Sequence, residues 1–311
     1  MAAGPIAPAP PSGPPWWVRI AVKSLLARLP LSDDVWRRFG VFRHGAMDDV
    51  GYAARILESH RRRAGVAALD GRTILELGPG DSVASAVIAR AHGARAVLVD
   101  AGPFAASDVS FYRLLSDRLR TDGLGAPDLS EARSLDDVLA ACEAEYLTEG
   151  LDSLRRLPSS SVHLVFSQAV LEHVRVAEFR ATLHELGRVL TDDGVASHRV
   201  DLRDHLGGSL NNLRVPSSVW EQPWFVRGGF YTNRMALSEM MEAFRSTHSS
   251  VEVSVRTQWG SPPIPRNRLA REFRDRSDED LRVAGFDVLL RGGGATAAPL
   301  STEDSGLRSQ G

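Results

Sequence analysis

The chain has 311 residues, 43% of them hydrophobic and 24% charged, with a formal net charge of −2. This composition is typical of a globular protein, and the near balance of 37 basic and 39 acidic residues creates no overall field for holding nucleic acid or an anionic membrane. The apolar stretches are far shorter than the roughly 20 residues of a membrane-spanning helix, and the lone Cys142 allows no intrachain disulfide. We therefore expect a cytoplasmic protein with no integral membrane segment and no nucleic-acid partner.

The two ends of the chain differ in composition from its middle. Residues 1–15 are rich in proline and residues 292–311 in glycine, alanine and serine, so both are expected to be disordered tails. From Trp16 to Leu29 apolar residues recur at helical spacing, and a second helix is expected over residues 48–63. Residues 16–70 are thus predicted to form a helical brace. The alternative is that the Trp16/Trp17 helix docks on a membrane surface or a partner.

A complete strand–helix–strand unit follows the brace. The pattern predicts a buried strand over Arg72–Leu77 and a tight turn at Gly78-Pro79-Gly80. The next helix is expected to begin at an Asp81 or Ser82 cap and to end at Gly93, and the second strand is expected over Ala94–Asp100.

Strands and helices continue to alternate after this unit. Further strands are expected at residues 145–147, 162–167, 194–200, 251–255 and 286–290, with a helix over 175–190 and a turn at 191–194. Alternating strands and helices predict an α/β, doubly wound sheet, in which ligands bind beyond the carboxyl ends of the central strands.

The turn after the first strand has the chemistry of a ligand loop. Gly78 and Gly80 allow a ligand to approach the backbone, but Val83 stands where a dinucleotide fingerprint needs its third glycine. No Gly-Lys-Ser/Thr follows, so a P-loop is excluded. Asp100 ends the second strand about 20 residues later, where a carboxylate can accept hydrogen bonds from ribose hydroxyls. The implied ligand is a nucleoside without a dinucleotide pyrophosphate.

Four segments together resemble the class I S-adenosylmethionine-dependent methyltransferases, in their small-molecule, type 11-like branch. The segments are ILELGPGDS, VLVD, VHLVFSQAVLEHV and LGRVLTDDGVASHRVDL, and the resemblance covers about Arg72 to Leu206. It implies an α/β domain over residues 71–291 with a Rossmann-like seven-stranded sheet, whose last strand pair is antiparallel. The N-terminal helices are added to this domain. The resemblance also implies an insertion covering the acceptor at about 205–250.

The resemblance further implies S-adenosyl-L-methionine as the cofactor. The residues that would bind it are Glu76, Gly78, Pro79, Gly80, Asp100, Ala101, Ser167 and Gln168. Glu76 and the glycines would line its methionine end, Asp100 would hold the ribose, and Ser167 with Gln168 would lie beside the sulfonium. The family often has an aspartate after its third strand, whereas this chain has residues 147–150 (LTEG) there. The adenine contacts are therefore assigned to 147–150 by position alone.

Three residues are candidates for a catalytic base: His173, His198 and Asp201. A hydroxyl acceptor benefits from a base, whereas a neutral amine needs little more than correct placement. Strand alternation puts His198 on one face of the fifth strand and Asp201 on the other. The alternatives are that His173 packs under the following helix and that Asp201 belongs to a salt-bridged loop. No metal site is expected.

The class of methyl acceptor is inferred mainly from the motifs that the sequence lacks. Ser-Gln-Ala-Val follows the fourth strand in place of the Asp/Asn-Pro-Pro-aromatic of enzymes that methylate nucleobase amines, and Cys142 follows alanine where cytosine C5 methylation needs proline. Asn, Tyr and Arg side chains at 207–213 and 228–234 could bind a polyhydroxylated acceptor, while Trp220, Trp224, Phe225 and Phe230 could stack on it or form a core. We expect O-methylation of a small polar or glycan-type acceptor. The alternatives are an N-methyltransferase on a small amine and a non-catalytic binding protein.

Overall fold

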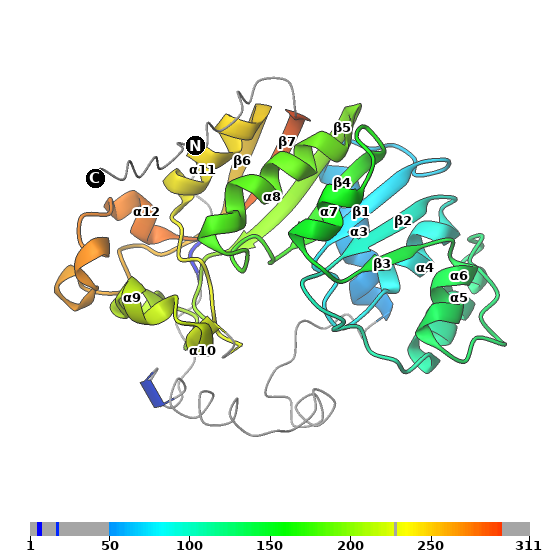
Figure 1. Ribbon diagram of the computed structural model, residues 1–311, viewed down its shortest axis with the longest axis horizontal. Helices are drawn as coiled ribbons and strands as arrows, with labels where there is room; N and C mark the ends of the chain where they lie inside the picture. The colour runs from blue at the N-terminus through cyan, green and yellow to red at the C-terminus, as the bar shows by residue number, and fades with distance from the viewer. Residues whose placement is uncertain (1–4, 8–16, 19–49, 227–228, 294–311) are drawn as a thin grey trace, which may run out of the picture.

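The computed structural model describes residues 5–7, 17–18, 50–226 and 229–293. One seven-stranded sheet, in the order β3-β2-β1-β4-β5-β7-β6, runs through it (Figure 1). Its strands are β1 Thr73–Leu77, β2 Arg95–Val99, β3 Glu145–Leu147, β4 Val162–Gln168, β5 Leu190–Asp201, β6 His248–Gln258 and β7 Val283–Gly293. Neighbouring strands are parallel except that β7 is antiparallel to both β5 and β6, as expected.

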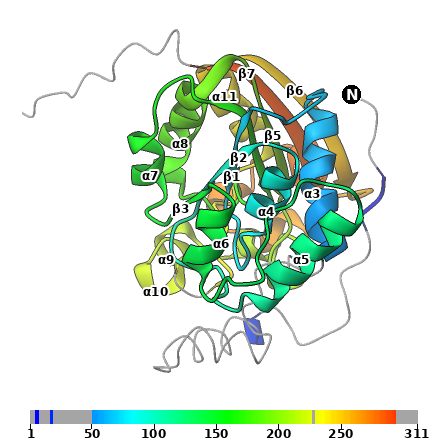
Figure 2. The same ribbon diagram turned by 90° about the vertical axis from the view of Figure 1, so that its right-hand side faces the viewer.

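Helices cover both faces of the sheet (Figure 2). On one face lie α3 Val50–Arg63, α4 Ala84–Ala91 and α5 Ser110–Thr121, and on the other α7 Leu151–Arg156, α8 Val176–Val189 and α11 Leu237–Thr247. The short α6 Leu135–Ala141 precedes β3. Because the central strands are buried on both faces, β4 is an almost continuous apolar run and not an alternating one. The sheet thus separates two hydrophobic cores.

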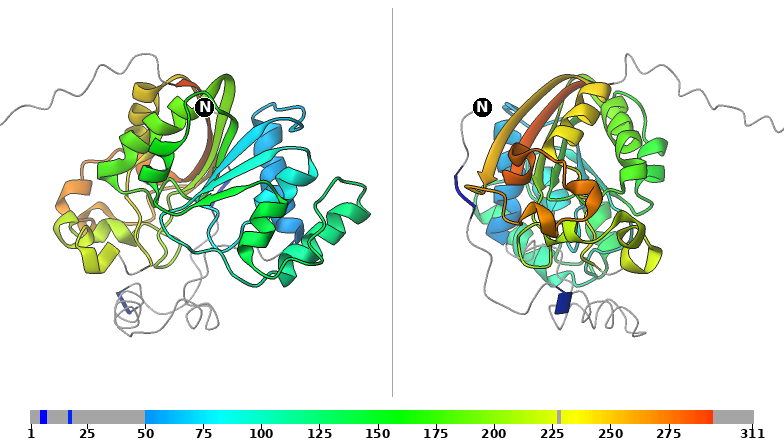
Figure 3. Two further views of the ribbon diagram at one scale, coloured as in Figure 1. Left: turned by 45° about the vertical axis from the view of Figure 1, so that its right-hand side comes forward. Right: turned by 90° about the vertical axis from the view of Figure 1, so that its left-hand side faces the viewer.

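A group of short elements lies beyond one end of β5, β6 and β7 (Figure 3). These are the 3₁₀ helices η1 Asn211–Arg214, η2 Arg266–Arg268 and η3 Arg271–Phe273, with α9 Ser217–Trp220, α10 Pro223–Val226 and α12 Asp278–Arg282. They belong to two chain segments, one after β5 and one between β6 and β7. This group lies at the carboxyl end of β5, where an insertion covering the acceptor was expected.

Some element bounds differ from expectation for local reasons. The helix after β1 begins at Ala84 and not at Asp81, because Gly80 has a φ of 67° and the backbone of Asp81 and Val83 is bonded to Ala106 and Tyr112. Its N-cap is Val83, with no side-chain cap, and the helix ends just before Gly93, as expected. The predicted turn at 191–194 is an irregularity within β5: pairing with β4 passes directly from Leu190 to Val195.

The two ends of the chain are only partly described. Residues 5–7, within the tail predicted over 1–15, lie against the end of β6: Ala7 N–H donates to Gln258 O at 2.7 Å, and Ala7 is buried. Most of the predicted brace helix, including Trp16, lies outside the described residues; Trp17 and Val18 are helical. Of the predicted C-terminal tail only Gly292 and Gly293 are described, as the end of β7.

Candidate active site

The glycine turn after β1 is joined to the carboxylate after β2. Because β1 and β2 are parallel neighbours, both strands end at the same edge of the sheet. Gly80 N–H donates to Asp100 Oδ2 at 2.9 Å, and Ala101 N–H donates to Asp100 Oδ1 at 2.7 Å. The carboxylate is therefore held in place beside the turn.

Gly78 allows the loop after β4 to close against this turn. Its φ is 72°, and a Cβ placed on it would lie only 2.5 Å from Val170 Cγ2. Ala169, the first residue after β4, also has a positive φ of 56°, which is costly for a residue other than glycine. Its N–H donates to Arg199 O at 2.9 Å. Two positive-φ positions, one of them costly because it is an alanine, therefore meet at this edge of the sheet.

Glu76 lies beneath the turn and not on its surface. It is 3% exposed, and its Oε2 has no hydrogen-bond partner among the residues that the structure describes. Burial raises the pKa of Glu76 to about 7, against the opposing effect of the Ser85 hydroxyl, and Asp100 raises it further. A cationic group placed beside Glu76 would favour its ionised form.

Ser167 and Gln168, expected together beside the sulfonium, point to opposite faces of the sheet. Ser167 is fully buried, and its hydroxyl lies 2.8 Å from Nδ1 of His198. Gln168 is half-buried, and its Oε1 lies 3.2 Å from Nε2 of His60 on α3. Strand alternation separates the two side chains, so only Gln168 remains a candidate for the cleft.

His60 is a residue that the sequence did not single out. It is fully buried, and burial lowers its pKa to about 3, so the ring is neutral. Because the Gln168 amide oxygen can only accept, His60 Nε2 donates to it and His60 Nδ1 accepts from the Ser197 hydroxyl at 2.8 Å. A single histidine inside a helix carries no sequence signal for this role, which depends on α3 packing over β4 and β5.

The prediction that His198 is a catalytic base is wrong. Its side chain is fully buried among strands and helices, and burial lowers its pKa to about 3. Alternation along β5 is as expected, but the face on which His198 lies is covered by α8 and not open to the cleft. With Nδ1 bonded to Ser167, His198 is a neutral core residue.

Asp201 also differs from the base expected of it. Its carboxylate accepts from Arg203 Nε at 2.9 Å, Arg203 Nη2 at 2.6 Å and the Arg203 N–H at 3.0 Å. Asp204 is buried and accepts from Leu206 N–H at 2.9 Å and from Asn211 Nδ2 at 3.1 Å. Both carboxylates stabilise the loop after β5, which is the structural alternative that the sequence left open.

His173 is exposed at the same edge as the glycine turn, in the loop after β4. Its Nδ1 lies 2.7 Å from the carbonyl oxygen of Tyr231, and its Nε2 lies 3.2 Å from Nε2 of His205. The two rings are stacked, with centroids 5.0 Å apart. Because a carbonyl can only accept, Nδ1 of His173 donates to it, and in the neutral ring Nε2 carries the lone pair. This tautomer is the one a general base needs.

The segment after α10 holds the His173 loop in position. Asn233 Nδ2 donates to Leu171 O at 2.8 Å and to Val174 O at 2.9 Å, and the Asn233 N–H donates to Glu172 O. Together with the Tyr231 carbonyl, these bonds join the loop to a segment about 60 residues later in the chain. The orientation of His173 is thus a product of tertiary structure.

The polar and aromatic residues expected to face an acceptor are mostly internal. Trp220, Phe225 and Phe230 form a small buried cluster with Tyr231. Asn233 is buried among the bonds just described, and the Tyr231 hydroxyl donates to Glu221. The aromatic residues therefore form a core, which was one of the two interpretations, and the side chain of Trp224 lies outside the described residues.

Glu172, the neighbour of His173, is the second residue that the sequence did not single out. It is 2% exposed, and its Oε1 accepts from the Asp201 N–H at 3.2 Å. Burial raises its pKa well above the ordinary value, and Asp201 raises it further. A glutamate next to a histidine gives no sequence sign of being buried.

Two further properties concern the described part of the chain as a whole. Within residues 5–7, 17–18, 50–226 and 229–293, no group of three or more His, Cys, Asp or Glu side chains is arranged to hold a metal ion. Across those same ranges, no helix has the length and apolar character needed to cross a membrane.

Comparisons with known proteins return structural matches only. No protein-family model matches the sequence, and no curated protein matches it. A methyltransferase from Mesorhizobium loti that depends on S-adenosylmethionine is 15% identical, with 78% of this chain and 100% of that chain covered and a TM-score of 0.41. A putative O-methyltransferase from Nostoc punctiforme is 11% identical, with 88% and 67% covered and a TM-score of 0.41.

A third match is geranyl diphosphate C-methyltransferase from Streptomyces coelicolor, solved with S-adenosyl-L-homocysteine. It is 15% identical over 77% of both chains, with a TM-score of 0.40. The architecture of the present chain is identified by its sheet order and by its antiparallel β7. The chain has the Rossmann-like, seven-stranded fold of the class I S-adenosylmethionine-dependent methyltransferases.

Proposed function

We propose that the protein is an S-adenosylmethionine-dependent methyltransferase that methylates a hydroxyl group of a small polar or glycan-type acceptor. The observation that carries the proposal is the Asp100 carboxylate, held by the N–H groups of Gly80 and Ala101 at the carboxyl ends of β1 and β2. In a doubly wound sheet this is where ligands bind, and a fixed carboxylate there suits a ribose diol.

The residues around Asp100 fit the other parts of the cofactor. Glu76 Oε2, which is buried and has no partner in the described part of the chain, could accept from the cofactor's ammonium group. Gln168 is held by His60 at the end of β4, close to the turn. Residues 147–150 directly adjoin Asp100: Asp100 N–H donates to Leu147 O at 2.8 Å, and Gly150 N–H donates to Asp100 O at 2.8 Å. This adjacency supports the assignment of the adenine contacts to residues 147–150.

His173 supports a hydroxyl as the methylated group. When bound, S-adenosylmethionine supplies an electrophilic methyl group on its sulfonium. An acceptor hydroxyl that replaces His205 at Nε2 of His173 could give its proton to that nitrogen as its oxygen attacks. The Tyr231 carbonyl keeps the Nδ1 proton in place, so the ring orientation is set before the acceptor arrives. His173 is exposed and can afterwards return the proton to water.

Calorimetric titration with S-adenosylhomocysteine tests the cofactor assignment. Asp100→Ala should weaken binding by about 100-fold, because two hydrogen bonds to a charged group are lost at about 1.5 kcal/mol or more each. Asp100→Asn keeps an acceptor oxygen of similar shape and should lose less. If the wild-type protein gives no heat and no thermal shift, or if Asp100→Ala binds as the wild type does, the proposal is wrong. If the cofactor binds as expected, transfer of a tritiated methyl group from S-adenosylmethionine to components of a cell extract would identify the acceptor.

A further inference from the structure

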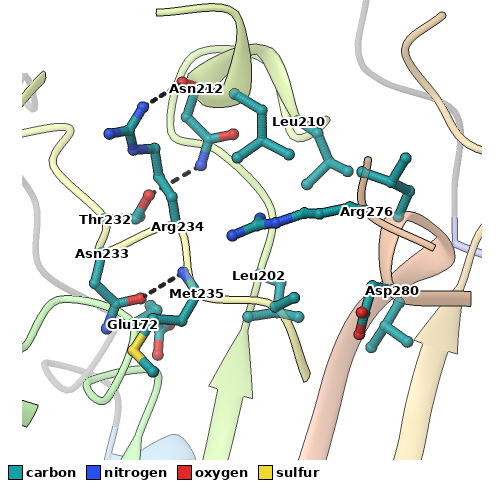
Figure 4. A pocket seen from close by; sticks show the side chains of 14 residues that line it. Glu172, Leu202, Leu210, Asn212, Thr232, Asn233, Arg234, Met235, Arg276 and Asp280 are labelled. Carbon is teal, nitrogen blue, oxygen red and sulfur yellow. Dashed lines mark hydrogen bonds between the residues drawn. The ribbon is translucent and has the colours of Figure 1, made fainter. Parts of the chain in front are cut away.

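The pocket beside α12 is too small to bind an organic ligand (Figure 4). Its cavity volume is about 20 Å³, which is room for about one water molecule. Asn212 donates to Thr232 at 3.0 Å and the Met235 N–H donates to Asn233 at 3.1 Å, so these residues hold the segments after β5 together. The loop that follows β2 differs, because it lies at the edge of the sheet where Asp100 is held.

Tyr146 on β3 bonds three backbone groups of the loop after β2 through its hydroxyl. The hydroxyl accepts from the Phe104 N–H at 3.0 Å and from the Ala105 N–H at 3.3 Å, and it donates to Gly102 O at 3.1 Å. Burial raises the pKa of Tyr146, against the opposing effect of the Ala105 and Phe104 N–H groups, so the hydroxyl keeps the proton that it donates. A hydroxyl can donate once and accept twice, so its whole hydrogen-bonding capacity is used on this one stretch of chain.

The loop itself has no regular structure, since residues 100–109 form neither helix nor strand. The Phe104 N–H also donates to Gly102 O at 3.0 Å, which closes a tight turn beneath the Tyr146 hydroxyl. Farther along, the Ala106 N–H donates to Asp81 O at 2.9 Å, directly after the glycine turn. Tyr146 therefore fixes the middle of a loop whose far end is fixed on that turn.

Tyr146 also adjoins the second segment beside Asp100. It directly precedes Leu147, whose carbonyl accepts from the Asp100 N–H at 2.8 Å. The loop begins at Ala101, whose N–H donates to Asp100 Oδ1 at 2.7 Å. In the proposed function Asp100 holds the ribose and residues 147–150 contact the adenine. Tyr146 thus joins the two segments on either side of the proposed nucleoside site.

We infer that Tyr146 is a positioning residue of the cofactor site, whose hydroxyl holds residues 102–105 in place as a wall for the adenosine part of S-adenosylmethionine. The inference rests on the proposed function, because Asp100 defines where the adenosine lies. Without the hydroxyl the loop would adopt other conformations in the free protein, and binding would have to order it at a cost in entropy. The hydroxyl therefore raises affinity without touching the reacting atoms.

Tyr146→Phe in the full chain, which removes the hydroxyl and keeps the ring, tests this inference. In calorimetric titrations S-adenosylhomocysteine and adenosine should each bind about tenfold more weakly than to the wild type, because both share the adenosine part. Hydrogen exchange followed by mass spectrometry should show faster deuterium uptake over residues 101–106 of the ligand-free variant, with uptake over β1 unchanged. A role in stability alone would lower the unfolding temperature and leave both affinities unchanged.

Tyr112→Phe is the matched control. It removes a phenol hydroxyl from the same hydrophobic core, where that hydroxyl accepts from the Val83 N–H at 3.1 Å and not from the loop after β2. The control should change neither the affinities nor the deuterium uptake over residues 101–106. An equal effect of Tyr112→Phe and Tyr146→Phe on the affinities would overturn the assignment of Tyr146.

The outcomes separate this inference from the proposed function. If the wild type binds S-adenosylhomocysteine and Tyr146→Phe binds both ligands equally well, the assignment of Tyr146 is wrong and the proposed function stands. Loss of affinity for S-adenosylhomocysteine but not for adenosine, or unchanged deuterium uptake over residues 101–106, has the same meaning. If the wild type binds adenosine but not S-adenosylhomocysteine, and Tyr146→Phe weakens that binding, Tyr146 positions a nucleoside site and the proposed function is wrong. A wild type that binds neither ligand overturns both.

Discussion

His198 is a neutral histidine buried in the sheet, and replacing it should change how the free energy of unfolding depends on pH. Burial lowers its pKa to about 3 from the ordinary 6.5, and His60 and His248 act in the same direction. The unfolded chain therefore takes up a proton near pH 6.5, while the folded chain does not until near pH 3. Stability is lost as the pH falls below the unfolded value, by about 1.4 kcal/mol per pH unit.

The effect of His198 alone is measured as a difference between the wild type and His198→Asn. Asparagine keeps a polar atom near the position of Nδ1 for Ser167 but does not titrate. Buried Glu76 and Glu172 also bind protons on acidification, but their contributions cancel in the difference. Between about pH 7.5 and about pH 5 the stability difference should shift by about 2 kcal/mol in favour of the variant.

Urea unfolding followed by circular dichroism at both pH values measures this shift, with the exposed His92→Asn as a matched control. The control should give a shift near zero, because its side chain is solvated in both states. If His198→Asn gives no larger shift than the control, His198 is not buried and neutral. His198 would then again be a candidate for the catalytic base.

Three further predictions concern single side chains. Gly78→Ala should destabilise the fold by about 2 kcal/mol in urea unfolding, because of its positive φ and the contact with Val170, and adding Val170→Ala should recover part of that loss; equal stability of Gly78→Ala and wild type would contradict this. His173→Gln should lower kcat on a hydroxyl acceptor by about 100-fold or more while leaving the affinity for S-adenosylhomocysteine unchanged, so normal turnover would exclude His173 as the base. Cys142 is buried, and burial raises the pKa of its thiol to about 12, so a thiol reagent should label it only after unfolding; rapid labelling of the native protein would refute this.

Features that depend on neighbours in the chain were predicted well. The first two strands, the glycine turn between them and the short strand at 145–147 all match the structure. The antiparallel end of the sheet, which the family resemblance implied, matches it too. Apolar runs, turn glycines and a carboxylate at a strand end are local signals, and parallel pairing of β1 with β2 follows from the connecting helix. The proximity of Gly80 to Asp100 therefore follows from these local signals.

Features that depend on which face a helix covers could not be predicted in this way. Ser167 and Gln168 are neighbours, but the sheet directs one into a core and the other to His60. Among the histidines, His198 is inside because α8 covers its side of β5, and His173 is exposed because Asn233 holds its loop at the edge of the sheet.

The sequence by itself thus determined the α/β architecture and the turn that indicates a nucleoside ligand. Only the tertiary structure decided which polar side chains are open to that ligand and which are buried in the core. The physical reason is that strand and turn signals come from residues close in sequence. The burial that sets the pKa of Glu172 and the contact that orients His173 come instead from segments about 30 and 60 residues away.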